Sequence, residues 1–293
     1  MYNFPFEGTP VTPEAVPFVV LVAALLHAAW NALAHGMAHK LAGFALMNTV
    51  FLAVGAAMAW PAPLPDRSAW PCLAASAALQ VCYQLQLLRA YRLGDFGQMY
   101  PLARGTSPMV VALVAATLLG DQLHGPRLLG ILVISLGLAG LAFAGGLPGR
   151  EQLPALGAAL TTGALIAAYT VVDGIGVRRA GGADGYIAWM FLTQGAAMLM
   201  VAALLRGRAL PGQLRQGRWT GLTGGLISLT AYGLVVWAQT AGDLATIAAL
   251  RETSIVLAAL IGVLFLRERL GHVRLAASAT VLTGIAVLEL AHG

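Results

Sequence analysis

Two arginines, Arg104 and Arg251, lie inside apolar stretches that are long enough to cross a bilayer. Each lies about seven residues into its stretch, which on a helix corresponds to a depth of roughly 10 Å. An ionisable side chain at that depth is costly in lipid and is therefore a candidate functional group. A guanidinium binds carboxylate or phosphate oxygens through paired hydrogen bonds, so both residues predict contact with an anionic group of a ligand. The alternative, a structural ion pair or a guanidinium that caps backbone carbonyls between helices, stays open.

Three other ionisable residues in apolar stretches are candidates for proton exchange: Glu252, His27 and Asp173. A carboxylate or an imidazole in a low dielectric can exchange a proton near neutral pH. Glu252 follows Arg251 directly, but adjacent side chains on a helix project about 100° apart, so pairing between the two is not assured. Asp173 falls near the end of its stretch, where an ordinary interfacial carboxylate is the alternative.

Uncharged polar and aromatic side chains share faces with these ionisable residues. Gln80, Tyr83 and Gln84 follow one another at the spacing of one helical face. Such a face is costly against lipid and suits a water-filled cavity. Single aromatic residues near the ends of apolar stretches can instead be interfacial anchors. We expect the ligand site to be lined by Arg104, Arg251, Tyr83, Gln84, Gln80, Trp30, Asn31, Tyr100, Ser107, Tyr169, Tyr232 and Trp237.

Ten apolar stretches would position these residues, because a membrane-spanning helix needs about 20 mostly apolar residues. We therefore expect an all-α integral membrane protein with ten transmembrane helices. The expected spans are 15–35, 41–60, 70–90, 97–119, 126–146, 153–174, 184–205, 219–239, 244–266 and 272–290.

The charged motif occurs twice. Residues 104–107 read Arg-Gly-Thr-Ser, and residues 251–254 read Arg-Glu-Thr-Ser, a shift of 147 residues (from 104 to 251). Five spans separate the two copies, so they enter the membrane from opposite sides and the repeat is inverted. We expect one five-helix repeat at 1–146, a second at 153–293, and a central cavity between them.

Composition favours a membrane protein and excludes several other classes. Hydrophobic residues make up 59% of the chain and charged residues 10%, against roughly 25% charged in soluble proteins. The net charge of +5 comes from basic residues between the apolar stretches, and they form no basic face for nucleic acid. Cys72 and Cys82 form neither a disulfide framework nor a metal site. With no phosphate-binding loop, HExxH or GxSxG motif, we expect no cofactor and no enzymatic activity.

Two segments carry a family resemblance. The first, AYRLGDFGQMYPLARGTSPMVVALVAATLLGDQL, contains Asp121, and the second, AGDLATIAALRETSIVLAALIGVLFLRERL, contains Glu268, each within Leu-x-Asp/Glu-x-Leu. They resemble EamA-type members of the drug/metabolite transporter superfamily, and the resemblance covers nearly the whole chain. It implies an inner-membrane carrier with a cavity lined by the first, third, fourth, sixth, eighth and ninth helices. Members of the family export amino acids and related metabolites.

The leading hypothesis is therefore a secondary transporter that exports small metabolites, with amino acids as the first expectation, by alternating access of the two repeats. The alternative is a flippase or an intramembrane enzyme that acts on an anionic lipid-linked or phosphorylated substrate. The expected partners are the bilayer and a small-molecule substrate, without nucleic acid, and the chain would be a monomer or homodimer. Most basic residues fall in odd-numbered connections, which predicts that both termini are extracytoplasmic.

Overall fold

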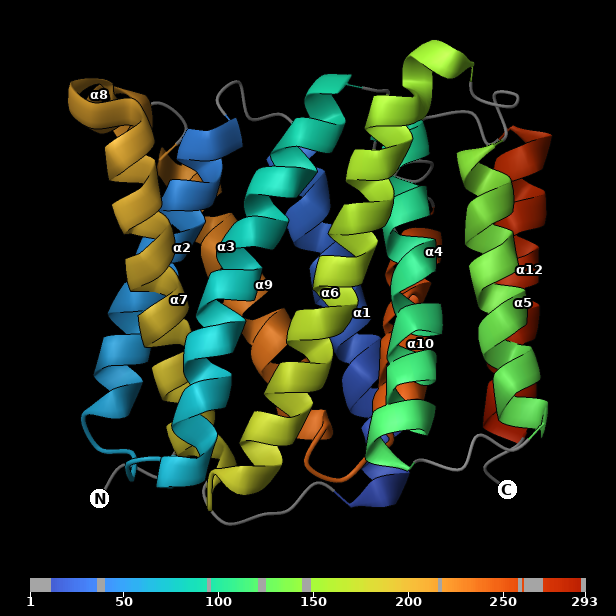
Figure 1. Ribbon diagram of the computed structural model, residues 1–293, viewed down its shortest axis with the longest axis horizontal. Coiled ribbons are helices and arrows are strands. Elements are labelled where there is room, and N and C mark those ends of the chain that lie inside the picture. The colour runs from blue at the N-terminus through green and yellow to red at the C-terminus, as the bar shows by residue number, and fades with distance from the viewer. Residues whose placement is uncertain are drawn as a thin grey trace. The chain divides into compact units, whose positions relative to one another are not determined.

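The chain folds into helices. A computed structural model describes residues 12–35, 40–93, 96–120, 125–143, 149–215, 218–257, 260 and 271–290, and no β-strand occurs among them (Figure 1). The helices are α1 (Val16–His35), α2 (Lys40–Ala59), α3 (Trp70–Leu93), α4 (Phe96–Val114), α5 (Gly125–Ala142), α6 (Leu153–Arg179), α7 (Ala183–Arg206), α8 (Leu210–Arg215), α9 (Arg218–Ala238), α10 (Leu244–Arg251) and α12 (His272–Leu290). Short 3₁₀ turns occupy Pro13–Ala15, Arg67–Ala69, Arg150–Gln152 and Gly207–Ala209, and the π-helical segment Ala115–Leu119 extends α4.

Six of the described helical segments are long and apolar enough to cross a membrane. They are Pro13–Asn31, Lys40–Ala59, Gly125–Ala142, Arg150–Arg179, Ala183–Arg215 and Arg218–Ala238. Helices α3 and α4 have sufficient length, with 24 and 19 residues, but they contain the polar residues Gln80, Gln84 and Arg104. The all-α membrane class therefore holds. The total of ten spans stays a prediction, because much of the expected span 244–266 lies outside the described residues.

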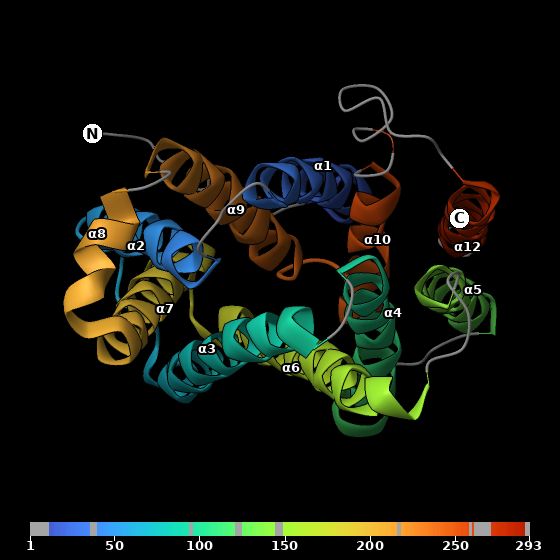
Figure 2. The same ribbon diagram turned by 90° about the horizontal axis from the view of Figure 1, so that it is seen from above.

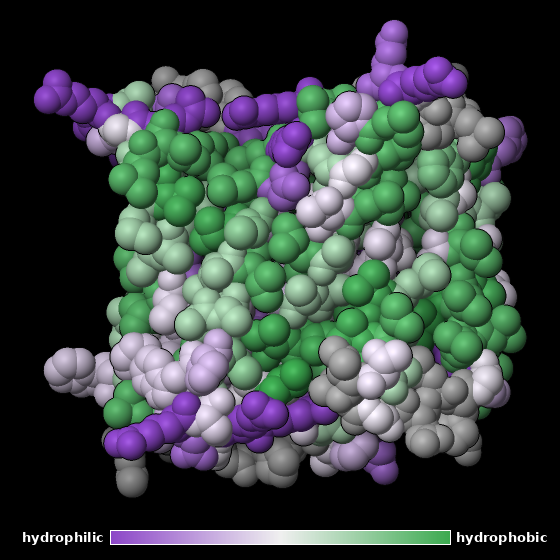
Figure 3. All heavy atoms as spheres, in the orientation of Figure 1, coloured by the Kyte–Doolittle hydropathy of each residue, from purple (hydrophilic) through white to green (hydrophobic). Residues whose placement is uncertain are grey.

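The outer surface of the helices fits contact with lipid. Figure 3 shows apolar side chains along the lengths of the helices and hydrophilic side chains near the helix ends. On α7 the exposed residues include Met200, Leu204 and Leu205. Trp60 directly follows α2, Trp219 is the second residue of α9, and both rings are largely exposed. Exposed tryptophans at the ends of apolar helices are typical of the membrane–water interface.

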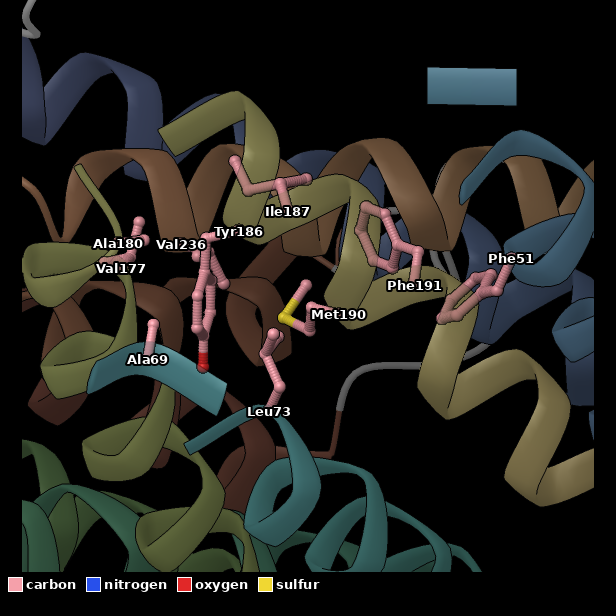
Figure 4. Packing of buried hydrophobic residues seen from close by; sticks show 10 residues of the cluster. All are labelled: Phe51, Ala69, Leu73, Val177, Ala180, Tyr186, Ile187, Met190, Phe191 and Val236. Atoms are coloured by element: carbon pink, nitrogen blue, oxygen red, sulfur yellow. The ribbon is translucent and has the colours of Figure 1, made fainter. Parts of the chain in front are cut away.

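The chain forms two compact units, and each takes helices from both halves of the sequence. Unit 1 comprises Met1–Val81 and Val172–Gly242. In it α2 packs along α7, and α9 packs against α1 and α2. Its apolar core includes Phe51 and Phe191, whose ring centroids lie 5.1 Å apart (Figure 4). The full core cluster is Phe51, Ala69, Leu73, Val177, Ala180, Tyr186, Ile187, Met190, Phe191 and Val236.

Unit 2 comprises Cys82–Val171 and Asp243–Gly293. In it α4 packs against α5 and α10, while α5 packs along α12; Figure 2 shows α5 and α12 side by side. Its core is built mainly from small side chains, which let helix backbones approach closely in a membrane. The buried cluster is Ala90, Met99, Leu102, Ala103, Ala142, Ala155, Ala158 and Ala159.

The contact between α5 and α12 follows the sequence repeat. A Cβ atom at Gly137 would lie 3.2 Å from the carbonyl oxygen of Ala277, and one at Gly284 would lie 2.9 Å from that of Gly130. The repeat shift of 147 residues converts Gly137 into Gly284 and Gly130 into Ala277, so each contact is the image of the other. The later position on α5 meets the earlier position on α12, so the two helices run antiparallel. This geometry supports an inverted repeat, whose boundaries stay a prediction.

The close α5–α12 contact makes Gly130 sensitive to substitution. A Cβ atom there would lie 2.9 Å from the Gly284 carbonyl oxygen and 3.0 Å from the Leu288 Cβ atom. We expect Gly130→Ala to lower the free energy of unfolding by about 1–3 kcal/mol, because the added methyl group would force the backbones of α5 and α12 apart. Gly140, on the same helix, has no atom within 4 Å of such a Cβ and provides the matched control. Thermal unfolding of both variants in detergent checks this, and equal midpoints would contradict it.

Several sequence predictions fall outside the described residues. Asp121 and Glu268, which end the two family-like segments, are among them. Asp121 follows the π-helical segment that extends α4, and Glu268 lies in the undescribed stretch before α12. All residues predicted to bind substrate or a proton are described.

Candidate functional site

Helices α4 and α10 carry the two copies of the charged motif. Asp243 begins α10 as its N-cap, accepting hydrogen bonds from the backbone N–H groups of Ala245 and Thr246 at 3.1 and 3.0 Å and from the Thr246 hydroxyl. Side-chain capping satisfies backbone donors that have no partner within the helix. The helix ends at Arg251, and a turn at Glu252 interrupts the expected span before the chain becomes helical again. This turn determines the direction of the Glu252 side chain.

Arg104 forms a buried ion pair with Glu252. Its Nε atom donates to Glu252 Oε2 at 2.8 Å, and the two side chains are 4% and 0% exposed. The Nη2 atom of Arg104 donates to Ser254 Oγ at 3.3 Å. The first copy of the motif therefore binds the second copy directly. Of the two roles that the sequence left open for Arg104, the ion pair between helices is present.

Arg251 has no such partner. Its side chain is buried, yet its Nε and Nη2 atoms make no hydrogen bond within the described part of the chain. The Oε1 atom of Glu252 and the Oγ atom of Ser107 are also buried without a hydrogen-bond partner. A buried polar group without a partner costs roughly 1–3 kcal/mol, and more when it is charged. A ligand that supplied the missing partners would remove this cost.

The repeat explains why Arg251 lacks a partner. The repeat shift relates Arg104 to Arg251, Ser254 to Ser107, and Glu252 to Gly105. If the Arg104 contacts were repeated for Arg251, they would join it to Ser107 and to residue 105. Residue 105 is a glycine, which has no carboxylate to offer. A Cβ atom at Gly105 would lie 2.8 Å from the Leu138 Cβ atom, so close packing against α5 favours glycine there. In the pair formed by the two motif copies, the Arg104 side is thus complete, and the Arg251 side lacks a carboxylate.

The described charges of this cluster do not cancel. Arg104 and Arg251 carry two positive charges against the single negative charge of Glu252. An uncompensated charge inside a membrane protein is unfavourable, and it marks a position where an anionic group is stabilised. Pro108 adds polarity, because it has no N–H to donate to the carbonyl oxygen of Arg104 one turn earlier. The site therefore favours a ligand with a negative charge.

Aromatic rings accompany the two guanidinium groups. The ring centroids of Tyr83, on α3, and Tyr169, on α6, lie 5.5 Å apart at an interplanar angle of 59°. Tyr83 and Tyr100 are within electrostatic reach of both Arg104 and Arg251. Phenol rings of this kind provide an apolar surface with hydrogen-bonding groups at its edge. Seven of the predicted residues belong to unit 2: Arg104, Arg251, Tyr83, Gln84, Tyr100, Ser107 and Tyr169.

The other five predicted substrate residues belong to unit 1: Trp30, Asn31, Gln80, Tyr232 and Trp237. Trp30 Nε1 donates to Nδ1 of His27 at 3.1 Å, and Asn31 Nδ2 donates to the His27 carbonyl oxygen at 2.8 Å. The polar groups on this part of α1 are therefore engaged with one another. Gln80 is buried on α3 with its Nε2 atom lacking a hydrogen-bond partner among the described residues.

Two functional features were missed by the sequence reasoning. Ser254 binds Arg104, although only Ser107 of the repeated serines was predicted to line the site. Tyr186 donates to the carboxylate of Asp173 at 2.9 Å, although no role was predicted for it from the sequence. The repeat could have indicated Ser254, because it is the counterpart of Ser107. No sequence signal links Tyr186 to Asp173, since they come from different helices.

Comparison with known proteins agrees with this architecture. Residues 153–290 match the EamA-like transporter family. No curated protein matches the sequence. Among solved structures, one described as "Crystal structure of protein" is similar at a TM-score of 0.74 with 20% identity, covering 94% of this chain and 96% of that chain. At that identity the likeness shows the fold alone. The second half of the chain, residues 153–290, therefore contains an EamA-like transporter domain, and the protein is a multi-pass membrane protein.

Proposed function

We propose that this protein is a secondary carrier that exports amino acids across the inner membrane by alternating access of its two inverted repeats. The observation that carries the proposal is the incomplete side of the motif pair. Arg251 has unused donors and Glu252 has an unused acceptor oxygen, both buried. An α-amino acid has a carboxylate and an ammonium group on one carbon atom. Its carboxylate would pair with Arg251 and its ammonium group with Glu252 Oε1.

This pairing satisfies the polar groups of the site in one step. The substrate carboxylate would replace the carboxylate that Gly105 cannot provide, and by the repeat relationship the Ser107 hydroxyl would donate to the same group. Charge-assisted hydrogen bonds of this kind are roughly twice as strong as neutral ones. The site would discriminate against molecules that have only one of the two groups, because a buried partner would remain unpaired.

The aromatic residues suggest which amino acids fit best. Tyr83, Tyr100 and Tyr169 are within electrostatic reach of Arg104, and the rings of Tyr83 and Tyr169 contact each other. Aromatic pairs gain roughly 0.5–1.5 kcal/mol beyond their buried area. We therefore expect aromatic or bulky apolar amino acids to bind more tightly than small ones. The predicted orientation, with both termini extracytoplasmic, and the predicted monomer or homodimer are carried forward with this proposal.

Ligand-dependent stabilisation of the detergent-purified protein tests the proposal. A ligand that binds only the folded state raises the midpoint of thermal unfolding, and the rise grows with the ratio of its concentration to its dissociation constant. We expect phenylalanine or leucine to raise the midpoint, while N-acetylphenylalanine, phenylalaninamide and phenethylamine have little effect. Stabilisation by phenyl phosphate but by no amino acid would instead favour the alternative, a carrier or flippase of phosphorylated substrates. No shift with any amino acid would contradict the proposal.

A further inference from the structure

Unit 1 contains a buried carboxylate that the proposed substrate site does not use. Asp173, on α6, is 0% exposed and lies within the apolar segment Arg150–Arg179. Its Oδ1 atom accepts a hydrogen bond from Tyr186 of α7 at 2.9 Å, and its Oδ2 atom accepts one from Tyr232 of α9 at 2.5 Å. The sequence predicted that this span would end at residue 174, but α6 continues to Arg179. Asp173 therefore lies inside the helix, away from its end.

The surroundings of Asp173 are shaped around this contact. Gly176 lies on the same helix, and a Cβ atom there would overlap the Tyr186 phenol, so the glycine leaves space for the ring. Figure 4 shows the ring of Tyr186 within the apolar cluster of unit 1. The hydroxyl of Ser76, on α3, faces the carboxylate, and its Oγ atom is buried without a geometrically defined hydrogen bond among the described residues. Four helices thus meet at one carboxyl group.

No cation in the described part of the chain pairs with Asp173. The buried ion pair between Arg104 and Glu252 belongs to unit 2. Facing Asp173 are Tyr186 from α7, Tyr232 from α9, and Ser76 and Cys72 from α3. Of the basic residues near the end of α6, Arg178 donates to the carbonyl oxygens of Gln239 and Gly242 at 2.8 and 2.6 Å, and Arg179 is exposed. Hydroxyl groups are therefore the polar partners of this carboxylate.

We propose that Asp173 is a proton-binding site that couples proton movement to transport. The surrounding hydroxyl groups can hydrogen-bond both the ionised and the protonated form of the Asp173 carboxyl group. As a carboxylate, Asp173 accepts hydrogen bonds from Tyr186 and Tyr232, which partly offsets the cost of a buried charge. When a proton binds, the carboxylate becomes a neutral acid with one O–H donor, and the unpaired Ser76 Oγ atom is the acceptor beside it. The step adds one proton and requires no other reactant.

This inference rests on the proposed carrier function and adds a second site to it. Two other candidates for proton exchange are already engaged: Glu252 is paired with Arg104, and the Nδ1 atom of His27 accepts a hydrogen bond from Trp30. Helix α6 carries both Asp173 and the predicted substrate residue Tyr169. Tyr169 contacts the ring of Tyr83 and is four residues before Asp173, on the same face of the helix. A change of charge at Asp173 therefore acts on the helix that carries Tyr169.

Proteoliposomes allow the coupling to be measured. The wild-type protein is reconstituted, and uptake of radiolabelled phenylalanine is measured with and without an imposed pH gradient, alongside counterflow exchange in the absence of any gradient. We expect the gradient to stimulate uptake by the wild type and not by Asp173→Asn, so that the ratio of driven uptake to exchange falls to the value without a gradient. Glu151→Gln, an exposed acid-to-amide control, should respond like the wild type. A full gradient response in Asp173→Asn would overturn the proposal.

A second measurement does not depend on the substrate or on a variant's transport activity. Infrared difference spectra of the wild type, titrated from about pH 5 to about pH 8, should show the C=O band of a protonated carboxylic acid that disappears as the pH rises. The band should be missing in Asp173→Asn and should titrate over a different range in Tyr232→Phe, which removes one hydrogen bond to the carboxylate. A carboxylate that stays ionised throughout would overturn the proposal even if phenylalanine is transported. Titration without phenylalanine exchange would leave the proton site standing and contradict the amino-acid carrier alone.

Discussion

Replacement of Arg251 by glutamine is expected to lower phenylalanine exchange in proteoliposomes about thirtyfold or more. The substrate carboxylate would lose a buried, charge-assisted partner, and truncating one side of such a pair costs about 2–5 kcal/mol, where each 1.4 kcal/mol is about tenfold. Glutamine retains polarity and most of the length of the side chain, so the change isolates the charge and the paired donors. Exchange rates normalised to the amount of reconstituted protein give the measurement.

Two further variants define what Arg251 provides. Arg251→Lys retains the positive charge but loses the planar pair of donors, so an intermediate rate is expected. Arg89→Gln removes the same charge at an exposed position on α3 and should exchange phenylalanine at the wild-type rate. If Arg251→Gln and Arg89→Gln were equally active, Arg251 would not bind the substrate.

Replacement of Arg104 by methionine is expected to lower the free energy of unfolding of the protein strongly. Removing one partner of a buried ion pair leaves the other charge uncompensated, at a cost of about 3–5 kcal/mol. Here Glu252 would lose its 2.8 Å hydrogen bond and would remain fully buried. The midpoint of thermal unfolding in detergent should therefore fall markedly in this variant.

A double-mutant cycle separates the ion pair from packing. The variant Arg104→Met with Glu252→Leu removes both charges and should be more stable than Arg104→Met alone, because apolar residues of similar volume can replace a buried pair. Each single variant and the double variant are compared with the wild type under the same conditions. Additive losses in the double variant would show that Arg104 and Glu252 do not act as a pair.

The sequence indicated which arginines lie inside helices, but not how they are arranged. Apolar stretches around Arg104 and Arg251 placed both inside helices, and the structure buries both. The partner of Arg104 is Glu252, 148 residues away, and that pairing depends on how α4 meets the turn after α10. A regular helix through residues 244–266 would have aimed Glu252 elsewhere. The turn at Glu252 therefore could not be deduced from helical periodicity.

The repeat was more informative than it first appeared. The replacement of Gly105 by Glu252 in the second copy is visible in the printed sequence. The consequence of this replacement is that Arg104 has a carboxylate partner and Arg251 has none. That difference became visible only with the contacts of Arg104 with Glu252 and Ser254. The number of membrane spans was harder to predict than the repeat, because the polar residues on α3 and α4 lower the hydropathy of these helices. Polar residues that suit a binding site therefore make the helices that carry them harder to recognise as membrane spans.

The role of Asp173 shows a similar limit. The sequence identified it as an ionisable residue close to the end of a span, where an ordinary surface carboxylate would be unremarkable. Burial by α7 and α9, with Tyr186 and Tyr232 as donors, is a tertiary property. Residues from three helices cannot be brought together by periodicity within one.

The most direct measurement is counterflow of radiolabelled phenylalanine into proteoliposomes that contain the purified protein and are preloaded with unlabelled compounds. We predict rapid uptake when the vesicles contain phenylalanine, and no uptake when they contain phenethylamine or N-acetylphenylalanine, because each lacks one of the two groups that Arg251 and Glu252 would bind. Equal uptake with N-acetylphenylalanine would contradict recognition of the ammonium group by Glu252. Absence of counterflow with every amino acid tested, in correctly reconstituted protein, would contradict the proposed function itself.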